Sequence, residues 1–149
     1  MTIRHLEEKD LDVICEIEQA SFTDPWSRQG FLDCLKLDHV ITLVVLEGER
    51  VAGYGCLYLV LGEGDIMNIA IAAAFWGRGL GGRLLDELLR AGKLKGAETF
   101  FLEVRKSNVP AINLYTSRGF KQIAVRKDFY QKPMEDALVM KLNANTHHP

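Results

Sequence analysis

The stretch "AAFWGRGLGGRLLDELL", from Ala73 to Leu89, packs four glycines into the six residues from Gly77 to Gly82. Behind them, leucines recur four apart from Leu80 to Leu88, with Leu85 alongside. This spacing predicts an amphipathic helix that starts at Leu80. Glycine costs roughly 0.5–1 kcal/mol relative to alanine in ordered backbone. The loop therefore indicates a place where bare main chain is needed at the mouth of a helix.

Patterns on either side of this loop predict short strands and helices. Ser27 and Asn108 are the expected N-caps of two helices, and Gly119 is the expected end of the second. Turns are expected at "EGER" (residues 47–50) and "GEG" (62–64). The order βααβββαβαββ predicts an α/β fold around a mixed, mostly antiparallel sheet flanked by helices. Strands are expected over residues 2–6, 40–46, 51–61, 65–71, 99–104, 121–130 and 137–142, and helices over 11–22, 26–37, 80–89 and 107–120.

With 149 residues, 48% of them hydrophobic and 26% charged, the chain has the composition of one globular domain. We expect a single domain over residues 1–149 whose polar tail is frayed from about residue 143. The net charge of −2 argues against direct nucleic-acid binding. The N-terminus is too charged for a signal peptide and no apolar run could span a membrane, so we expect a cytoplasmic protein without membrane contact. Neither the four histidines nor the three cysteines (Cys15, Cys34 and Cys56) have metal-ligand spacing, so we expect reduced thiols and no metal.

The glycine loop is suited to hold a phosphate, because helix N-termini present unpaired N–H groups and a partial positive charge. Arg78 could add a charge-assisted hydrogen bond. A tight turn without a ligand is the alternative. A second alternative is a dinucleotide site, since Gly77, Gly79 and Gly82 satisfy GxGxxG and Glu103 lies near the distance of a ribose-binding acid. Against it, "AAAFW" separates the glycines from the preceding strand, hairpin-linked strands come first, and too little chain follows for a full dinucleotide fold. Walker A fails, because no Gly-Lys-Ser/Thr ends the loop.

Several motifs together resemble the GNAT acetyltransferases, which use acetyl-CoA. They are "NIAI" (68–71), a loop that matches most of (Gln/Arg)-x-x-Gly-x-(Gly/Ala), "LEVR" (102–105) and "SN…A…LY…GF" (107–120). With "PWS" and "EDALVMKL", the chain is similar to the RimI-type bacterial members, which acetylate the N-terminal alanine of a small-subunit ribosomal protein. The resemblance covers nearly the whole chain and implies the GNAT (acyl-CoA N-acyltransferase) fold. One departure is Trp76 at the usual Gln/Arg position, where we expect altered packing rather than lost binding.

The resemblance also implies a binding mode for acetyl-CoA as co-substrate. The glycine loop would wrap the pyrophosphate, and the strand before it would pair its main chain with the pantetheine arm, although a plain core strand is the alternative. Asn108 would lie near the thioester, and its N-cap role is compatible with that contact. The implied cofactor-binding residues are Ile69, Ala70, Ile71, Gly77, Arg78, Gly79, Leu80, Gly81, Gly82 and Asn108.

Two further residues match the catalytic pattern of the family. Glu103 would be the general base and Tyr115 the acid that returns a proton to the CoA thiolate, with N–H groups near Ile69 as oxyanion donors. An α-amine has a pKa of about 7.7–8, so a modest base is sufficient. A solvated strand-edge carboxylate is the alternative for Glu103, and a core aromatic for Tyr115. No cysteine or serine lies in a nucleophile motif, so direct transfer is expected.

The acceptor is less defined by the sequence. Asp24, Asp128, Glu135 and Asp136 predict an acidic mouth for a basic peptide, or simply a solvated face. Phe129 and Tyr130 would wall the peptide groove or cover the core. The first hypothesis is an N-terminal alanine acetyltransferase, as a monomer or weak oligomer. The alternatives are acetylation of a lysine or small-molecule amine, a non-catalytic CoA-binding module and, more remotely, a nicotinamide oxidoreductase.

Overall fold

The computed structural model describes residues 1–144 and has the predicted order of strands and helices, with two short 3-10 helices (η1 and η2) added. The α/β fold class is therefore confirmed. The elements are β1 (Thr2–His5), η1 (Glu8–Asp10), α1 (Leu11–Ser21), α2 (Arg28–Cys34), β2 (Val40–Glu47), β3 (Arg50–Val60), β4 (Glu63–Ile71), η2 (Ala73–Phe75), α3 (Leu80–Leu94), β5 (Thr99–Arg105), α4 (Val109–Ser117), β6 (Lys121–Gln131) and β7 (Met134–Asn143).

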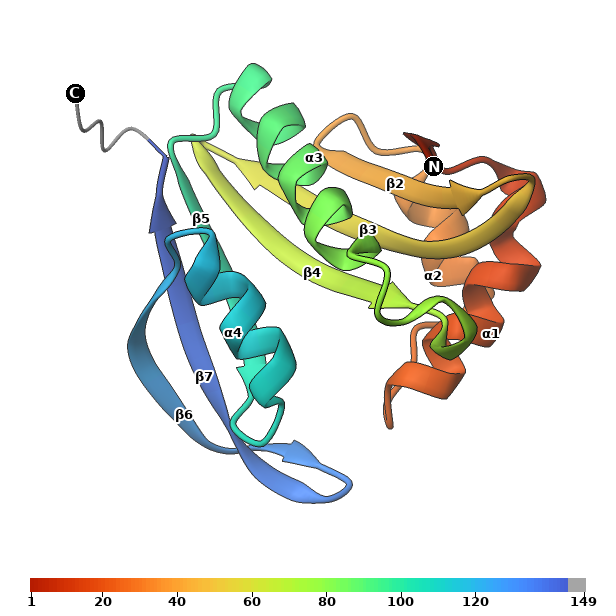
Figure 1. Ribbon diagram of the computed structural model, residues 1–149. Helices are drawn as coiled ribbons and strands as arrows, with labels where there is room; N and C mark the ends of the chain where they lie inside the picture. The colour runs from red at the N-terminus through yellow and green to blue at the C-terminus, as the bar shows by residue number, and fades with distance from the viewer. Residues whose placement is uncertain (145–149) are drawn as a thin grey trace.

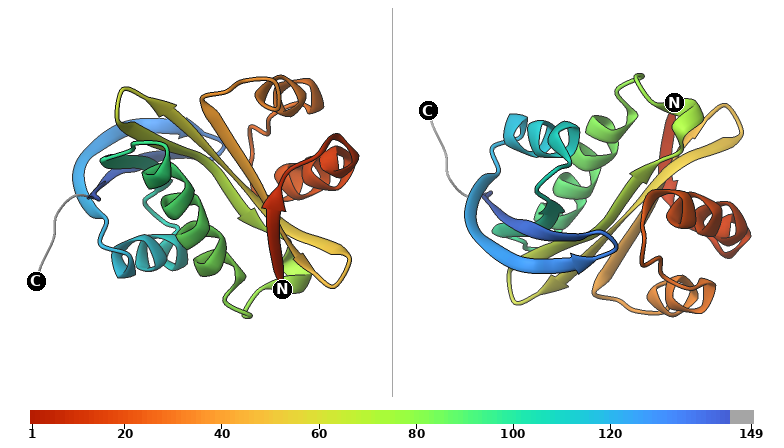
Figure 2. Two further views of the ribbon diagram at one scale, coloured as in Figure 1. Left: turned by 90° about the horizontal axis from the view of Figure 1, so that it is seen from above. Right: turned by 90° about the horizontal axis from the view of Figure 1, so that it is seen from below.

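One sheet with strand order β1-β2-β3-β4-β5-β7-β6 forms the centre of the molecule. All neighbouring strands are antiparallel except β4 and β5, which are parallel. Figure 2 shows α3 and α4 on one side of the sheet and α1 and α2 on the other. Two hydrophobic clusters follow from this arrangement, one beneath α3 and one beneath α1 and α2. Strands β2 and β3 are thus buried on both faces, whereas β5 is buried on the α3 side and more exposed on the other.

The predicted roles of three residues at helix ends, Ser27, Asn108 and Gly119, are confirmed. The Ser27 hydroxyl accepts a hydrogen bond from the Gly30 N–H at 3.0 Å, and the Asn108 side chain accepts one from the Ala111 N–H at 3.3 Å. Gly119 ends the α4 turn with a φ of 95°. Ser27 and Asn108 each accept a hydrogen bond from an amide that has no partner within its helix, and Gly119 adopts the left-handed backbone conformation that ends α4.

Several boundary predictions need correction. The structure has α2 and α4 shorter than the predicted 26–37 and 107–120, α3 extended from 89 to Leu94, and β7 begun at Met134 rather than 137. Gly64 is not a turn residue: β4 already begins at Glu63, and a Cβ on Gly64 would lie 2.8 Å from the Phe100 ring, so this glycine makes room for packing. At the other end, β7 is ordered through Asn143, because Asn143 pairs with Thr99 of β5. The rest of the predicted frayed tail, residues 145–149, lies outside the described residues.

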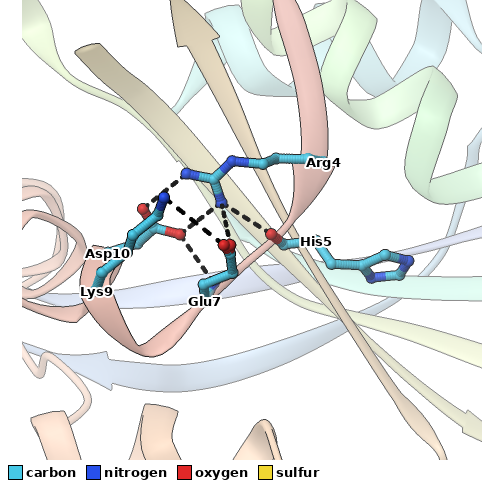
Figure 3. A network of polar contacts seen from close by, with 5 residues as sticks. All are labelled: Arg4, His5, Glu7, Lys9 and Asp10. Carbon is cyan, nitrogen blue, oxygen red and sulfur yellow. Dashed lines mark hydrogen bonds and ion pairs between the residues drawn. The ribbon is translucent and has the colours of Figure 1, made fainter. Parts of the chain in front are cut away.

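An ion pair fastens the N-terminal strand to the start of α1. The Arg4 guanidinium donates to both carboxylate oxygens of Asp10, at 2.7 and 3.0 Å, and the Glu7 N–H donates to Asp10 at 2.8 Å (Figure 3). Asp10 is 4% exposed. Burial alone would raise the Asp10 pKa, but the bonds from Arg4 and Glu7 outweigh it and hold that pKa below its usual value.

Candidate active site

A gap opens in the sheet between β4 and β5. The two parallel strands pair from Glu63 and Thr99 to Ile66 and Leu102, and then diverge (Figure 1). Beyond Ile66, β4 stays paired with β3 on its other side as far as Ile71. Its edge toward β5 therefore has no strand partner along that length, and unpaired backbone groups of this kind need a partner.

The register of β3 and β4 decides which amides face the gap. The Ala72 N–H donates to the Ala52 carbonyl at 2.7 Å, which makes Ile71 and Gly53 a non-hydrogen-bonded pair. The same parity holds for Ile69, so the N–H and C=O groups of Ile69 and Ile71 point toward the gap. Those of Ala70 point toward β3. The three predicted backbone contacts are thus divided: Ile69 and Ile71 offer free groups, and Ala70 is the spacer.

Trp76 forms a hydrogen bond with one of the backbone groups that face the gap. Its indole Nε1–H donates to the Ile71 carbonyl at 2.7 Å, while 69% of the residue remains exposed. The departure from the family motif therefore has a definite structural consequence. The Ile71 N–H and both groups of Ile69 are left without a strand partner.

The glycine loop ends in a helix N-terminus without a side-chain cap. Gly77 and Gly79 have φ values of 80° and 75°, in the left-handed region that favours glycine, and Gly79 is the N-cap of α3. The first α3 bond runs from the Arg83 N–H to the Gly79 carbonyl at 3.2 Å. The N–H groups from Leu80 to Gly82 therefore lack intrahelical acceptors. This is the arrangement that binds anionic oxygens.

The remaining loop residues differ in what they contact. A Cβ on Gly81 would meet only ordinary contacts at 3.7 Å or more, whereas a Cβ on Gly82 would lie 2.5 Å from the Arg118 guanidinium. The Arg78 guanidinium lies 5.3 Å from the centre of the Phe75 ring, a cation–π contact. Only the first two glycines of the loop are thus required by backbone angle.

Glu103 and Tyr115 lie on opposite sides of the sheet. On β5, Leu102 and Val104 point into the cluster beneath α3, so Glu103 points to the α1 and α2 side. Its carboxylate is partly exposed and pairs with Arg126 Nε at 2.7 Å. Tyr115 lies in α4, within the cluster on the α3 side. The alternative for Glu103, a solvated strand-edge carboxylate, does not include this cationic partner.

The Tyr115 ring is buried and meets the Phe120 ring edge-on, with 5.9 Å between centroids. Burial, and then the charge of Tyr130, raises the pKa of Tyr115 to about 12. In residues 1–144, only the Asn68 Oδ1 is a fully buried side-chain oxygen or nitrogen without a partner. The Tyr115 hydroxyl has no hydrogen-bond partner among these residues. Since it is not one of the fully buried atoms without a partner, it retains contact with solvent. The phenol is held in place by its ring and keeps a free hydroxyl.

Tyr130 is a half-buried residue of β6, suggested by the sequence as a groove wall. Its ring lies 4.3 Å from the Arg105 guanidinium and 5.1 Å from the Phe129 ring. Burial first, and then the charge of Glu103, raises the pKa of Tyr130.

Two of the acidic residues predicted for the mouth are already engaged. Glu135 pairs with Arg105 at 3.2 Å and accepts the Ser107 N–H at 2.5 Å. Asp136 accepts the Asp128 N–H at 2.9 Å. These contacts hold the chain around the β6–β7 turn, so fewer carboxylates are free to attract a basic peptide than the sequence predicts.

Sequence reasoning missed a buried carboxylate close to β4. Glu18 is 1% exposed and accepts hydrogen bonds from the Tyr54 hydroxyl, from Asn68 Nδ2 at 3.0 Å and from the Trp26 N–H at 3.0 Å. Burial and the bond to Glu18 raise the pKa of Tyr54. Glu18 follows the buried Ile14 by four residues, and this position on the apolar helix face could have identified it.

The residues that the structure describes bear on two features, metal-ligand clusters and membrane-spanning helices. No group of three or more His, Cys, Asp or Glu side chains is placed to hold a metal ion within residues 1–144. Nor does that part of the chain contain a helix long and apolar enough to cross a membrane. The three cysteines are free, with Cys56 buried and the other two half-buried.

Comparison with known proteins gives consistent matches. A profile of the acetyltransferase (GNAT) family matches residues 11–120. The chain is 36% identical over 143 residues to the [ribosomal protein bS18]-alanine N-acetyltransferase of Salmonella typhimurium, covering 95% of this chain and 96% of that protein. Its counterpart from Haemophilus influenzae is 37% identical over 141 residues, or 93% and 95% of the two chains. The crystal structure of the ribosomal-protein-S18-alanine N-acetyltransferase from Escherichia coli has a TM-score of 0.89 and 32% identity, covering 99% of this chain and 96% of that chain.

Proposed function

Because the chain belongs to the GNAT acetyltransferase family, and is thus an acetyl-CoA-dependent N-acetyltransferase, we propose that it acetylates the α-amine of an N-terminal alanine on ribosomal protein bS18. The observation that carries this proposal is the gap between β4 and β5. Free amides of Ile69 and Ile71 line it, the α3 N-terminus lies on one face and Glu103 on the other.

The cofactor side is the face of α3 and α4. The N–H groups from Leu80 to Gly82 would receive the pyrophosphate, and the free groups of Ile69 and Ile71 would pair with the amides of the pantetheine arm. Asn108, at the N-terminus of α4, would lie next to the thioester while its side chain caps the helix. Every one of these contacts uses a main-chain group or a cap that is already in position.

The acceptor amine would enter from the Glu103 face. Its nitrogen attacks the thioester carbon, a C–N bond forms, and Glu103 takes the proton that the amine loses. The N–H near Ile69 would stabilise the oxyanion, and the C–S bond then breaks. For the carboxylate to act as a base, its ion pair with Arg126 must open when the acceptor binds.

Tyr115 would support the departing sulfur from the opposite face. With a pKa of about 12, the phenol stays protonated at every pH at which the enzyme works. Full transfer of its proton to a thiolate of ordinary pKa, about 8.5, would be uphill by roughly 5 kcal/mol. Tyr115 therefore acts as a hydrogen-bond donor to the sulfur as the C–S bond breaks, in place of the full proton transfer that the family pattern implies. The CoA thiolate then takes its proton from solvent as product leaves.

The acceptor identity comes from the names of the relatives, and a ribosomal protein acceptor implies an enzyme that works in the cytoplasm. A monomer or weak oligomer is part of the proposal. The test is incubation with acetyl-CoA and an Ala-starting peptide that also contains an internal lysine. Tandem mass spectrometry should locate one acetyl group on the α-amine. Acetyl only on the lysine would indicate a different acceptor class, and cofactor binding without any product would indicate a non-catalytic module.

A further inference from the structure

Arg105 joins two chain segments that are far apart in sequence. Its Nη2 donates to the Thr23 hydroxyl at 3.1 Å, and its Nη1 donates to the Pro133 carbonyl at 2.9 Å and to Glu135 at 3.2 Å. The guanidinium also lies 4.3 Å from the centre of the Tyr130 ring. One side chain thus contacts both the α1–α2 segment (residues 22–27) and the β6–β7 tip (residues 130–135).

Under the proposed function, both segments border the face of the sheet from which the acceptor would enter. Arg105 follows Glu103 by two residues on β5, so the two side chains share the face of the sheet opposite α3. The cofactor would occupy the α3 side, which leaves this face to the amine. Arg105 also lies beside Tyr130, which is coupled electrostatically to Glu103. The contacts of Arg105 therefore fix the two segments at the entrance to the base.

The chemistry of Arg105 suits this role. Its fork of N–H donors can bond two segments at once, which a lysine ammonium does with far less geometric definition. Its side chain is 22% exposed and Glu135 17% exposed, so water competes with these bonds only in part. By contrast, Thr23 itself is exposed and has no other side-chain bond among the described residues.

We propose that Arg105 is a positioning residue for the acceptor: by joining the α1–α2 segment to the β6–β7 tip, it shapes the peptide groove that delivers the amine to Glu103. The inference rests on the proposed function. It assigns Arg105 no contact with acetyl-CoA and no proton transfer. Its effect should therefore appear in the KM for peptide and leave the KM for acetyl-CoA unchanged.

The kinetic test compares Arg105→Ala, Arg105→Lys and Thr23→Val with Arg90→Ala as the matched control, since Arg90 lies exposed on α3. Arg105→Ala should raise the peptide KM about tenfold, the effect of losing a hydrogen bond to a charged group. The peptide KM of Arg105→Lys should lie between those of Arg105→Ala and wild type. Thr23→Val should raise the peptide KM by less, and should add nothing in the Arg105→Ala background, because the two changes remove the same bond.

A measurement without substrates separates this inference from the proposed function. Hydrogen exchange read by mass spectrometry should show faster exchange in both segments in Arg105→Ala, and no change in Arg90→Ala. Unchanged exchange in residues 22–27 overturns the proposal, whether or not the wild type acetylates the peptide. So does an unchanged peptide KM, an equal rise in the acetyl-CoA KM, or a full additive effect of Thr23→Val. Failure of wild type to acetylate any peptide would instead overturn the proposed function.

Discussion

At the scale of single residues, the account depends on two side chains on opposite sides of the sheet. Glu103→Gln removes the proposed base, and Tyr115→Phe removes only a hydroxyl that has no partner among the described residues. Glu103→Gln should lower kcat by about 10²-fold, the usual effect of losing general base assistance. Tyr115→Phe should lower kcat by about tenfold, the effect of losing a hydrogen bond to a charged group. Steady-state kinetics should show an unchanged KM for acetyl-CoA. Glu98→Gln, on an exposed carboxylate, and Tyr58→Phe, on a half-buried tyrosine of β3, are the matched controls.

The pH profile adds a second check on the same residues. The wild-type rate should rise as the acceptor amine loses its proton through about pH 8. It should not fall again below pH 10, because the Tyr115 pKa of about 12 keeps that phenol protonated. A descending limb near pH 9 that disappears in Tyr115→Phe would contradict the role given to this residue.

Asp10 is expected to control acid stability. Its pKa is lower in the folded than in the unfolded chain, so its ion pair with Arg4 stabilises the fold above the unfolded value of about 3.9. That contribution is lost as the pH falls through the lowered folded pKa. Asp10→Asn should cost on the order of 2 kcal/mol at pH 7, and the difference from wild type should shrink below pH 4. Urea unfolding across this range measures both.

The control for this prediction is Asp12→Asn. The Asp12 side chain is 86% exposed in its pair with Arg28, so its removal should have little effect. If the difference in free energy of unfolding between wild type and Asp10→Asn grew on acidification, the predicted pH dependence would be wrong.

At the scale of elements, the four glycines around the start of α3 are expected to differ in their response to substitution. Gly79→Ala forces a Cβ into left-handed backbone at a cost of about 1–2 kcal/mol and should disturb the exposed amides. Gly81→Ala meets only ordinary contacts inside a helix and should be neutral or slightly stabilising. Calorimetric titration should show weaker acetyl-CoA binding for Gly79→Ala alone. Equal losses for both variants would mean that backbone angle is not what the loop requires.

Local sequence predicts elements well where a single residue determines their ends. Ser27 and Asn108 each bond an amide three residues ahead, so the signal and its partner lie in the same turn. The turn predicted at Gly64 is wrong, because glycine is needed there to make room for the Phe100 ring, which lies 36 residues further along the chain. Turn and packing glycines look alike until the tertiary neighbour is known.

At the scale of the whole molecule, the sequence predicts the fold and the residues of the candidate site. It does not predict which backbone groups of the site are free or which side chains contact one another. Which amides of β4 are free depends on the β3 register and on where pairing with β5 stops at Ile66. Arg105 reaches Thr23 across 82 residues of sequence, and Arg126 reaches Glu103 from another strand. No local pattern contains such contacts, because they arise only when strands distant in the chain become neighbours in the sheet.

The most direct test of the central claim is residue-resolved amide exchange, followed by NMR, with and without saturating acetyl-CoA. Ile69 and Ile71, whose N–H groups face the gap, should exchange more slowly when acetyl-CoA is bound. Ala70, already directed at β3, should be unchanged and serves as the internal control. Slow exchange at Leu80 to Gly82 with no change at Ile69 and Ile71 would mean that the diphosphate binds but the gap in the sheet does not hold the acyl carrier, and that result would contradict the account.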